Sequence, residues 1–167
     1  MTNPLLQYLL VAPFPLALVW AMLSDLRRFE IPNAIPILLL SAFLVASVAH
    51  GTEPVIVLRQ CGIGAAALAV GFALFAFGVV GGGDVKLIAT LLPWLAPGQI
   101  PAFLFWMAIA GGLVGLFIIA LRHVPTIPEV FGKAWLEQLR DGGKIPYGLA
   151  IGCAGLITFG NIPLLAN

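Results

Sequence analysis

The sequence predicts an all-α membrane protein, a polytopic helix bundle with six transmembrane segments and a short fourth helix. Hydrophobic residues make up 61% of the 167 residues and charged residues only 9%, which is too little polar surface for a soluble domain of this length. The apolar residues also occur in runs that match a hydrocarbon core of about 30 Å. We expect one membrane-embedded domain, residues 1–167. Its approximate spans are 5–22, 34–49, 58–80, 85–96, 100–121 and 146–165.

Prolines and polar residues mark the ends of these spans. Pro13 and Pro15 predict a kink in the first span, whereas Pro36 falls in the first turn of the second, where proline is tolerated. The third span is long enough to tilt. The fourth has about half the usual length, because the chain is then broken at Pro93, Pro97 and Gly98. The polar section 122–144 precedes the last span, and Phe131, Trp135 and Leu139 recur there at the spacing of an interfacial or loop helix.

The distribution of basic residues decides whether the short fourth segment crosses the membrane. If it crosses, only Arg59 lies apart from the other basic residues. The residues that then share one side are Arg27, Arg28, Lys86, Arg122, Lys133, Arg140 and Lys144. The positive-inside rule therefore favours six crossings, with both termini outside the cytoplasm. Asp25 and Asp84 then reach the same cytoplasmic face and can meet between the first and fourth helices.

Each of these two aspartates also has a simpler explanation. Asp84 follows a glycine triplet and starts an apolar segment, so it could serve as a helix N-cap. Asp25 follows the first span beside Arg27 and Arg28, and could form a loop salt bridge. Together on one face they indicate a carboxylate pair that shares one proton and can activate water against a peptide bond. Helix dipoles predict that Asp25, at a helix C-terminus, holds that proton.

Other chemistries lack their motifs. His50 and His123 fall on opposite sides and form no HExxH pattern, and the two cysteines, Cys61 and Cys153, form no CxxC pair. The glycines before Asp84 lack the GxxxxGK[ST] pattern of a nucleotide site. We expect no metal and no cofactor. We expect these glycines to admit an extended substrate backbone and to turn the chain sharply into the fourth helix.

Three stretches resemble the prepilin peptidases, the membrane aspartyl proteases of the GxGD type. The first is Asp25-Leu26-Arg27-Arg28-Phe29-Glu30-Ile31-Pro32-Asn33, similar to the family's first-aspartate motif. The second, Gly81-Gly82-Gly83-Asp84-Val85-Lys86, reads as the GxGD motif with its lysine. The third, Lys144-Ile145-Pro146-Tyr147-Gly148, resembles the family's start of the last helix.

The resemblance implies that Asp25 and Asp84 are the catalytic pair. The supporting residues that it implies are Gly81, Gly83, Lys86, Pro32, Asn33, Pro146, Tyr147 and Gly148. It also implies an endopeptidase of the bacterial inner membrane that removes the basic leader of type IV pilin or pseudopilin precursors at the cytoplasmic face. The partners are then these precursors and the lipid bilayer, with no nucleic acid, and a homo-oligomer stays open. Many relatives carry a cytoplasmic cysteine cluster and methylate the product. No such cluster is present here, so we expect peptidase activity alone and a place in the short branch that serves Flp/Tad-type pili.

Two functions of other classes remain open. A small proton- or cation-coupled carrier would also use a broken helix and membrane carboxylates, although no inverted repeat is visible. A non-catalytic membrane component of a secretion system would use the same acids in structural salt bridges.

Overall fold

The computed structural model describes residues 4–124, 133–141 and 145–161, and its secondary structure there is helical throughout, as the sequence predicts. The α-helices are α1 (Pro4–Val11), α2 (Pro13–Arg28), α3 (Ala34–Ala49), α4 (Pro54–Ala76), α5 (Gly82–Leu91), α6 (Ile100–Arg122), α7 (Lys133–Asp141) and α8 (Tyr147–Thr158). The 3-10 turns are η1 (Leu92–Trp94), η2 (Pro97–Gln99) and η3 (Phe159–Asn161). Phe131, Lys144 and the end of the last expected span lie outside the described residues.

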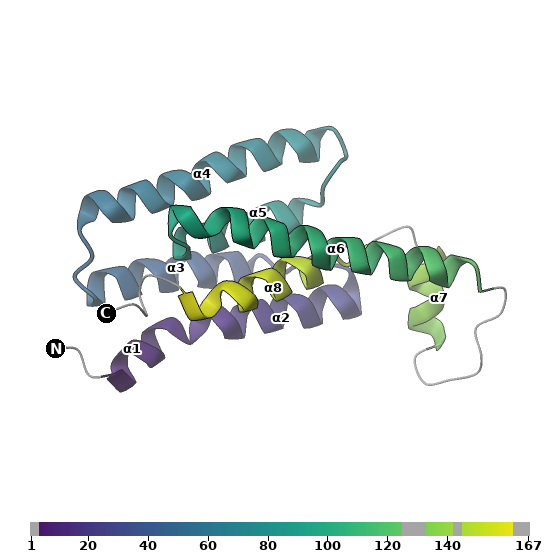
Figure 1. Cartoon of the computed structure of the whole chain (residues 1–167), viewed down its shortest axis with the longest axis horizontal. Coiled ribbons are helices and arrows are strands. Elements are labelled where there is room, and N and C mark those ends of the chain that lie inside the picture. Colours follow the sequence, from purple (N-terminus) through teal and green to yellow (C-terminus); the bar gives the residue numbers. More distant parts are fainter. Residues whose placement is uncertain (1–3, 125–132, 142–144, 162–167) are drawn as a thin grey trace.

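The helices α2 to α6 and α8 lie roughly along one axis and alternate in direction (Figure 1). The chain runs one way in α2, α4 and α6 and returns in α3, α5 and α8, while the short α7 packs at one end of the bundle. The end of α2, the start of α5 and the start of α8 therefore meet at the same end of the bundle. We call this the site end.

The outer surface of the bundle is suited to lipid. Three stretches are long and apolar enough to cross a membrane: Gln7–Arg28, Pro54–Ala76 and Pro97–Arg122. In the second and third, only 11% of the most apolar window is buried inside the protein, and large side chains such as Phe72 and Leu113 point outward. Exposed apolar surface on this scale indicates a multi-pass membrane protein. The helices α3 and α8 are apolar but shorter, and α5, with 10 residues, is about 15 Å long.

Proline explains two helix starts and one break. Pro13 is the first residue of α2 and separates it from α1, which confirms the expected kink. Pro54 similarly starts α4, where its missing N–H leaves no helical hydrogen bond unmade.

At its other end α2 continues to Arg28, so Asp25 lies in the last turn of a helix and not in a following loop.

Trp94 fills the core at the level where α5 ends. It is 1% exposed, and its Nε1–H donates to the carbonyl of Leu39 at 3.1 Å. Its ring centroid lies 5.2 Å from that of Phe14 in a tilted arrangement and 5.8 Å from that of Phe43 in an edge-on arrangement. Gln60 of α4 donates to the neighbouring Leu95 carbonyl at 3.1 Å. These contacts fix the end of α5 between α3 and α4.

Two glycines of α4 let α5 approach it closely. A Cβ at Gly64 would lie 2.5 Å from the Ala89 carbonyl oxygen, and a Cβ at Gly71 would lie 2.6 Å from Cγ1 of Val85. Small residues permit such close helix approach in membranes. The position of α5, and with it Asp84, therefore depends on the glycines of α4.

Candidate active site

A cavity of about 1120 Å³ opens at the site end. Its wall comes from the end of α2, the second half of α4, the start of α5, Met107 of α6 and the start of α8. Asp25 and Asp84, which are 59 residues apart in the sequence, both line it. The structure thus brings the two predicted acids to one cavity from two different helices.

Asp25 is held from the start of α8. Its side chain is 5% exposed, and its Oδ2 accepts a hydrogen bond of 2.7 Å from the backbone N–H of Gly148. A Cβ at residue 148 would lie 2.8 Å from that oxygen, so only glycine lets the helix come this close. The exposed Arg27 and Arg28 follow on the same helix. The contact joins the first and third sequence motifs.

Asp84 lies in the first turn of α5, where the N-cap is Gly81 and not the aspartate. Its carboxylate accepts a hydrogen bond from the Gly81 backbone, which is the return bond of a capping box. Asp84 lies outside the three long spans. Burial, and then the nearby Asp25 carboxylate, raise the pKa of Asp84 to about 6 against the Gly81 hydrogen bond, which lowers it.

The arrangement favours the opposite proton assignment to the one expected from the sequence. Asp25 does end its own helix and its burial disfavours a negative charge, but its carboxylate lies at the N-terminus of α8, whose dipole and Gly148 N–H favour the ionised form. Asp84 is the acid whose pKa is raised to about 6 by burial and by the charge of Asp25. Burial therefore disfavours charge on both acids, and the hydrogen bond from α8 to Asp25 favours Asp84 as the holder of a shared proton.

The glycines before Asp84 serve close packing, and the turn lies earlier than we expected. The positive φ is at Gly78, with a value of 71°, between α4 and α5. A Cβ at Gly83 would lie 3.2 Å from Cβ of Ile31, and a Cβ at Gly81 would lie 2.8 Å from Oδ2 of Asp84. The prediction that the triplet itself turns the chain is wrong in position, since Gly78 is the residue with the left-handed backbone.

The other predicted support residues lie around the cavity. Lys86 donates from Nζ to Oδ1 of Asn33 at 2.9 Å, and this bond ties α5 to the N-cap of α3 beside the half-buried Pro32. Pro146 is buried at the N-cap of α8. Tyr147 lines the cavity, and a Cβ at Gly111 of α6 would meet its ring.

Phe29 and Glu30 also line the cavity, although the sequence predicts no separate role for either. Phe29 ends α2 with φ 53° and ψ 35°, the left-handed conformation, and its N–H donates to the Asp25 carbonyl at 2.8 Å. Glu30 follows, with its own carbonyl accepting from the Ser24 hydroxyl at 2.8 Å. Glycine or asparagine usually occupies the left-handed position that ends a helix. Phenylalanine there gives no sequence signal of the reversal that directs these residues to the cavity.

Acidic side chains supply the charge of this cavity. Among the described residues that line it, Asp25, Glu30 and Asp84 are carboxylates, and none is lysine, arginine or histidine. The remaining wall is mainly apolar and glycine-rich, from residues such as Phe75 and Gly71 of α4. The cavity is thus suited to a positively charged, partly apolar ligand.

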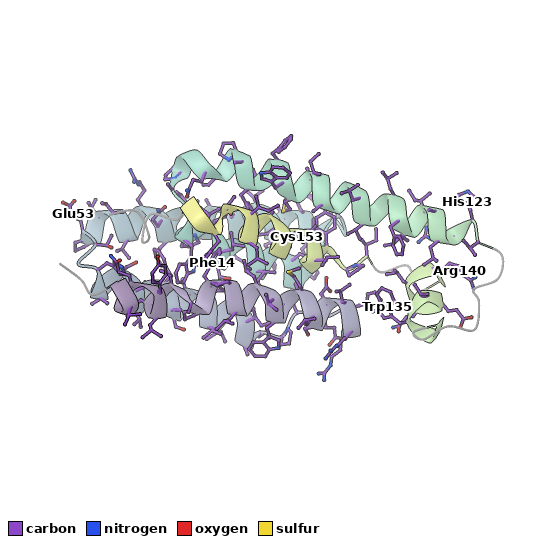
Figure 2. All side chains as sticks on the ribbon, turned by 60° about the horizontal axis from the view of Figure 1, so that its bottom comes forward. Phe14, Glu53, His123, Trp135, Arg140 and Cys153 are labelled. Atoms are coloured by element: carbon purple, nitrogen blue, oxygen red, sulfur yellow. The ribbon has the colours of Figure 1, made fainter. Side chains whose placement is uncertain are left out.

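The α7 helix, whose formation the sequence predicts, packs beside this end. The indole N–H of Trp135 donates to the Leu26 carbonyl, and Leu139 is 2% exposed. Figure 2 shows Trp135 and Arg140 at the opposite end of the molecule from Glu53. The helix therefore contacts the turn of α2 that carries Asp25.

Residues 12–116 match the sequence model of the type IV leader peptidase family. A comparison with curated proteins gave no match, and neither did a comparison with solved structures. The matched region is more than half of the chain and contains Asp25 and Asp84, whereas α8 lies beyond it. The chain belongs to the type IV leader peptidase family.

Proposed function

We propose that this protein is a GxGD-type aspartic endopeptidase that removes the basic leader from type IV pilin or pseudopilin precursors. The observation that carries the proposal is that Asp25 and Asp84 line one cavity and interact electrostatically. Like charges held together favour one shared proton, the state that two-carboxylate hydrolysis requires. The family supplies the general activity, a leader peptidase of the membrane.

In this mechanism the two aspartates have different roles, one as base and one as acid. Ionised Asp25 takes a proton from a water molecule, and the water oxygen attacks the scissile carbonyl carbon. Asp84, protonated, donates a hydrogen bond to the carbonyl oxygen and stabilises its developing negative charge. Collapse of the tetrahedral intermediate breaks the C–N bond, and the proton held by Asp25 passes to the leaving amine. Neither a metal ion nor a covalent intermediate takes part.

The charge of the cavity supports a basic leader as substrate. Glu30, exposed at the end of α2, adds a third carboxylate beside the two aspartates. A cavity lined by charges of one sign attracts ligands of the opposite sign and raises their local concentration. We propose that basic leader residues enter beside Glu30, and that the apolar wall from α4 accepts the hydrophobic segment that follows the cleavage site.

We further propose six crossings, with the site end at the cytoplasmic face of the bacterial inner membrane. Support comes from the alternating directions of the six helices (Figure 1) and from the described basic residues at the site end. These are Arg27 and Arg28 at the end of α2, Lys86 in α5, Arg122 at the end of α6 and Arg140 in α7. Arg59 lies near the start of α4, at the other end.

The decisive experiment uses the purified full chain in proteoliposomes with a precursor that has a basic leader and a glycine before the cleavage site. Asp25→Asn and Asp84→Asn should each abolish cleavage, whereas Glu53→Gln, a carboxylate change at the opposite end of the bundle, should not (Figure 2). Cleavage by either normally inserted asparagine variant would refute the two-acid mechanism. Failure of the wild type to cut any such precursor would refute the peptidase proposal and favour a carrier or a non-catalytic secretion component.

The six-crossing topology has its own test. With Cys61 and Cys153 replaced by alanine, single cysteines at Arg28 and Gly98 should react with impermeant maleimide from opposite sides of the membrane. If α5 crosses, three crossings (α3, α4 and α5) separate the two positions; if it does not, only two do. Arg28 ends α2, and Gly98 lies in the turn between α5 and α6. Labelling from the same side would refute the crossing by α5.

We propose that the protein cleaves without methylating its product, as in the short branch that serves Flp/Tad-type pili. The 167 residues hold two cysteines, one in α4 and one in α8, and thus no cysteine cluster. The mass of the mature product after incubation with a methyl donor tests this. An added methyl group would refute it and leave the peptidase proposal intact.

A further inference from the structure

The start of α8 supplies a fixed hydrogen-bond donor to Asp25. Gly148 is the second residue of α8, so its N–H is one of the four at the helix N-terminus that have no partner within the helix. It donates to Oδ2 of Asp25 at 2.7 Å, and both residues are buried. An N–H bond of this length to a carboxylate is charge-assisted, and the helix dipole adds to it.

The surrounding packing holds this amide in place. A Cβ at residue 148 would lie 2.8 Å from Oδ2 and 3.1 Å from Cβ and Cγ of Asp25. Buried Pro146 caps the helix, and the Tyr147 side chain fills the space that Gly111 of α6 leaves open. Any side chain at residue 148 would therefore displace Asp25.

The charged groups around Asp25 make a donor necessary. Asp84 on α5 opposes a negative charge on Asp25, and Glu30 beyond the end of α2 lines the same cavity. Of the nearby basic side chains, Lys86 of α5 donates to Asn33, whereas Arg27 and Arg28, which share α2 with Asp25, are exposed. Tyr147 is the ionisable side chain at the start of α8. The described α3 carries no charged residue.

We propose that Gly148 is a positioning residue of the active site: its backbone N–H holds Oδ2 of Asp25, keeps that carboxylate the ionised member of the pair, and leaves Oδ1 to take the proton from water. The inference rests on the proposed two-aspartate mechanism and assigns its roles, with Asp25 as base and Asp84 as acid. It also gives the third sequence motif a physical function, since the motif provides the helix start and the glycine.

The test replaces the amide and adds no atom. Glycolic acid, the α-hydroxy analogue of glycine, is incorporated at position 148 of the full chain, so that an ester oxygen replaces the N–H. We expect kcat to fall about 10- to 100-fold, the range for a hydrogen bond to a charged group, with little change in KM for the precursor. The acidic limb of kcat/KM should move to higher pH. The matched control is the α-hydroxy analogue of leucine at Leu149, the next amide of the same turn, which should leave that limb in place.

A second pair of variants tests the close approach of α8 to Asp25. Gly148→Ala should lower kcat at least as much as the ester and move the acidic limb in the same direction. Gly152→Ala, one turn along the same helix, would place its Cβ 2.3 Å from the Met22 side chain and away from the acid. It should lower thermal stability and leave the acidic limb unchanged.

Two outcomes would overturn the inference. One is an ester variant with the kcat and acidic limb of the wild type. The other is a loss of kcat with the acidic limb unmoved, which would mean that Gly148 only packs. Both are distinguishable from failure of the proposed function, which would appear as an inactive wild type or as cleavage by Asp25→Asn.

Discussion

Gly64→Ala tests whether the contact between α4 and α5 positions the proposed acid Asp84. The new Cβ would lie 2.5 Å from the backbone oxygen of Ala89, whereas ordinary contacts begin at 3.4 Å. The helix α5 must therefore move away by about 0.9 Å, the difference between these distances. Asp84 is in the same short helix. Because a misplacement of about 1 Å can cost about 100-fold in rate, we expect kcat to fall about 10- to 100-fold.

The control is Gly62→Ala, two residues earlier in α4, where a Cβ meets nothing within 4 Å. Both substitutions gain the same helix propensity, up to about 1 kcal/mol, so that term cancels between them. The remaining difference is the overpacking cost of about 1–3 kcal/mol. Thermal unfolding in detergent and precursor cleavage in proteoliposomes measure the two effects. A Gly64→Ala protein with the stability and kcat of the control would refute the view that this contact holds Asp84 in place.

Three further predictions concern the acids. With the pKa of Asp84 raised to about 6 from 3.8, kcat/KM should fall as pH rises above about 6, because Asp84 then loses the proton that polarises the carbonyl; a profile flat from pH 5 to 8 would contradict this. The raised pKa also means that the folded state binds this proton more tightly than the unfolded state, so the free energy of unfolding falls as the pH rises from about 4 to about 6. The inactive Asp84→Asn variant should therefore melt at a higher temperature than the wild type at pH 7 in detergent. Glu30→Gln should raise KM about 3- to 10-fold for a basic leader at unchanged kcat, as expected for an exposed ion pair of about 1 kcal/mol, and a matched neutral leader should show no change.

The sequence carried enough information to predict the helical class and most helix positions. The expected span 34–49 coincides with α3, and the expected span 100–121 is one residue shorter than α6. Long apolar runs bounded by proline determine such helices locally. The expected span 58–80 differs from α4 (Pro54–Ala76) at both ends, because Pro54 serves as the first residue of the helix and the chain turns at Gly78.

The site was predictable as a set of motifs but not as a geometry. The two aspartates, the Lys86 and Asn33 pair and Gly148 all lie in stretches that the resemblance identified. Which of them touch one another depends on contacts between helices, which have no local sequence signature. For this reason the sequence gives no signal for Gly64 and Gly71, whose importance lies in the backbone and side chains of α5 that approach them.

The protonation of Asp25 shows most clearly how the sequence and the tertiary structure contribute differently. From the sequence, Asp25 is an acid at the end of its own helix, a position that disfavours negative charge. In the fold, the N-terminus of α8 meets this carboxylate 123 residues later in the chain, and its amide favours the ionised form. The sequence by itself determined the membrane class and most of the helices and indicated the two candidate acids, because these follow from local composition and motif. Only the tertiary structure decided their environments, because desolvation and hydrogen bonding come from whichever helices pack against them.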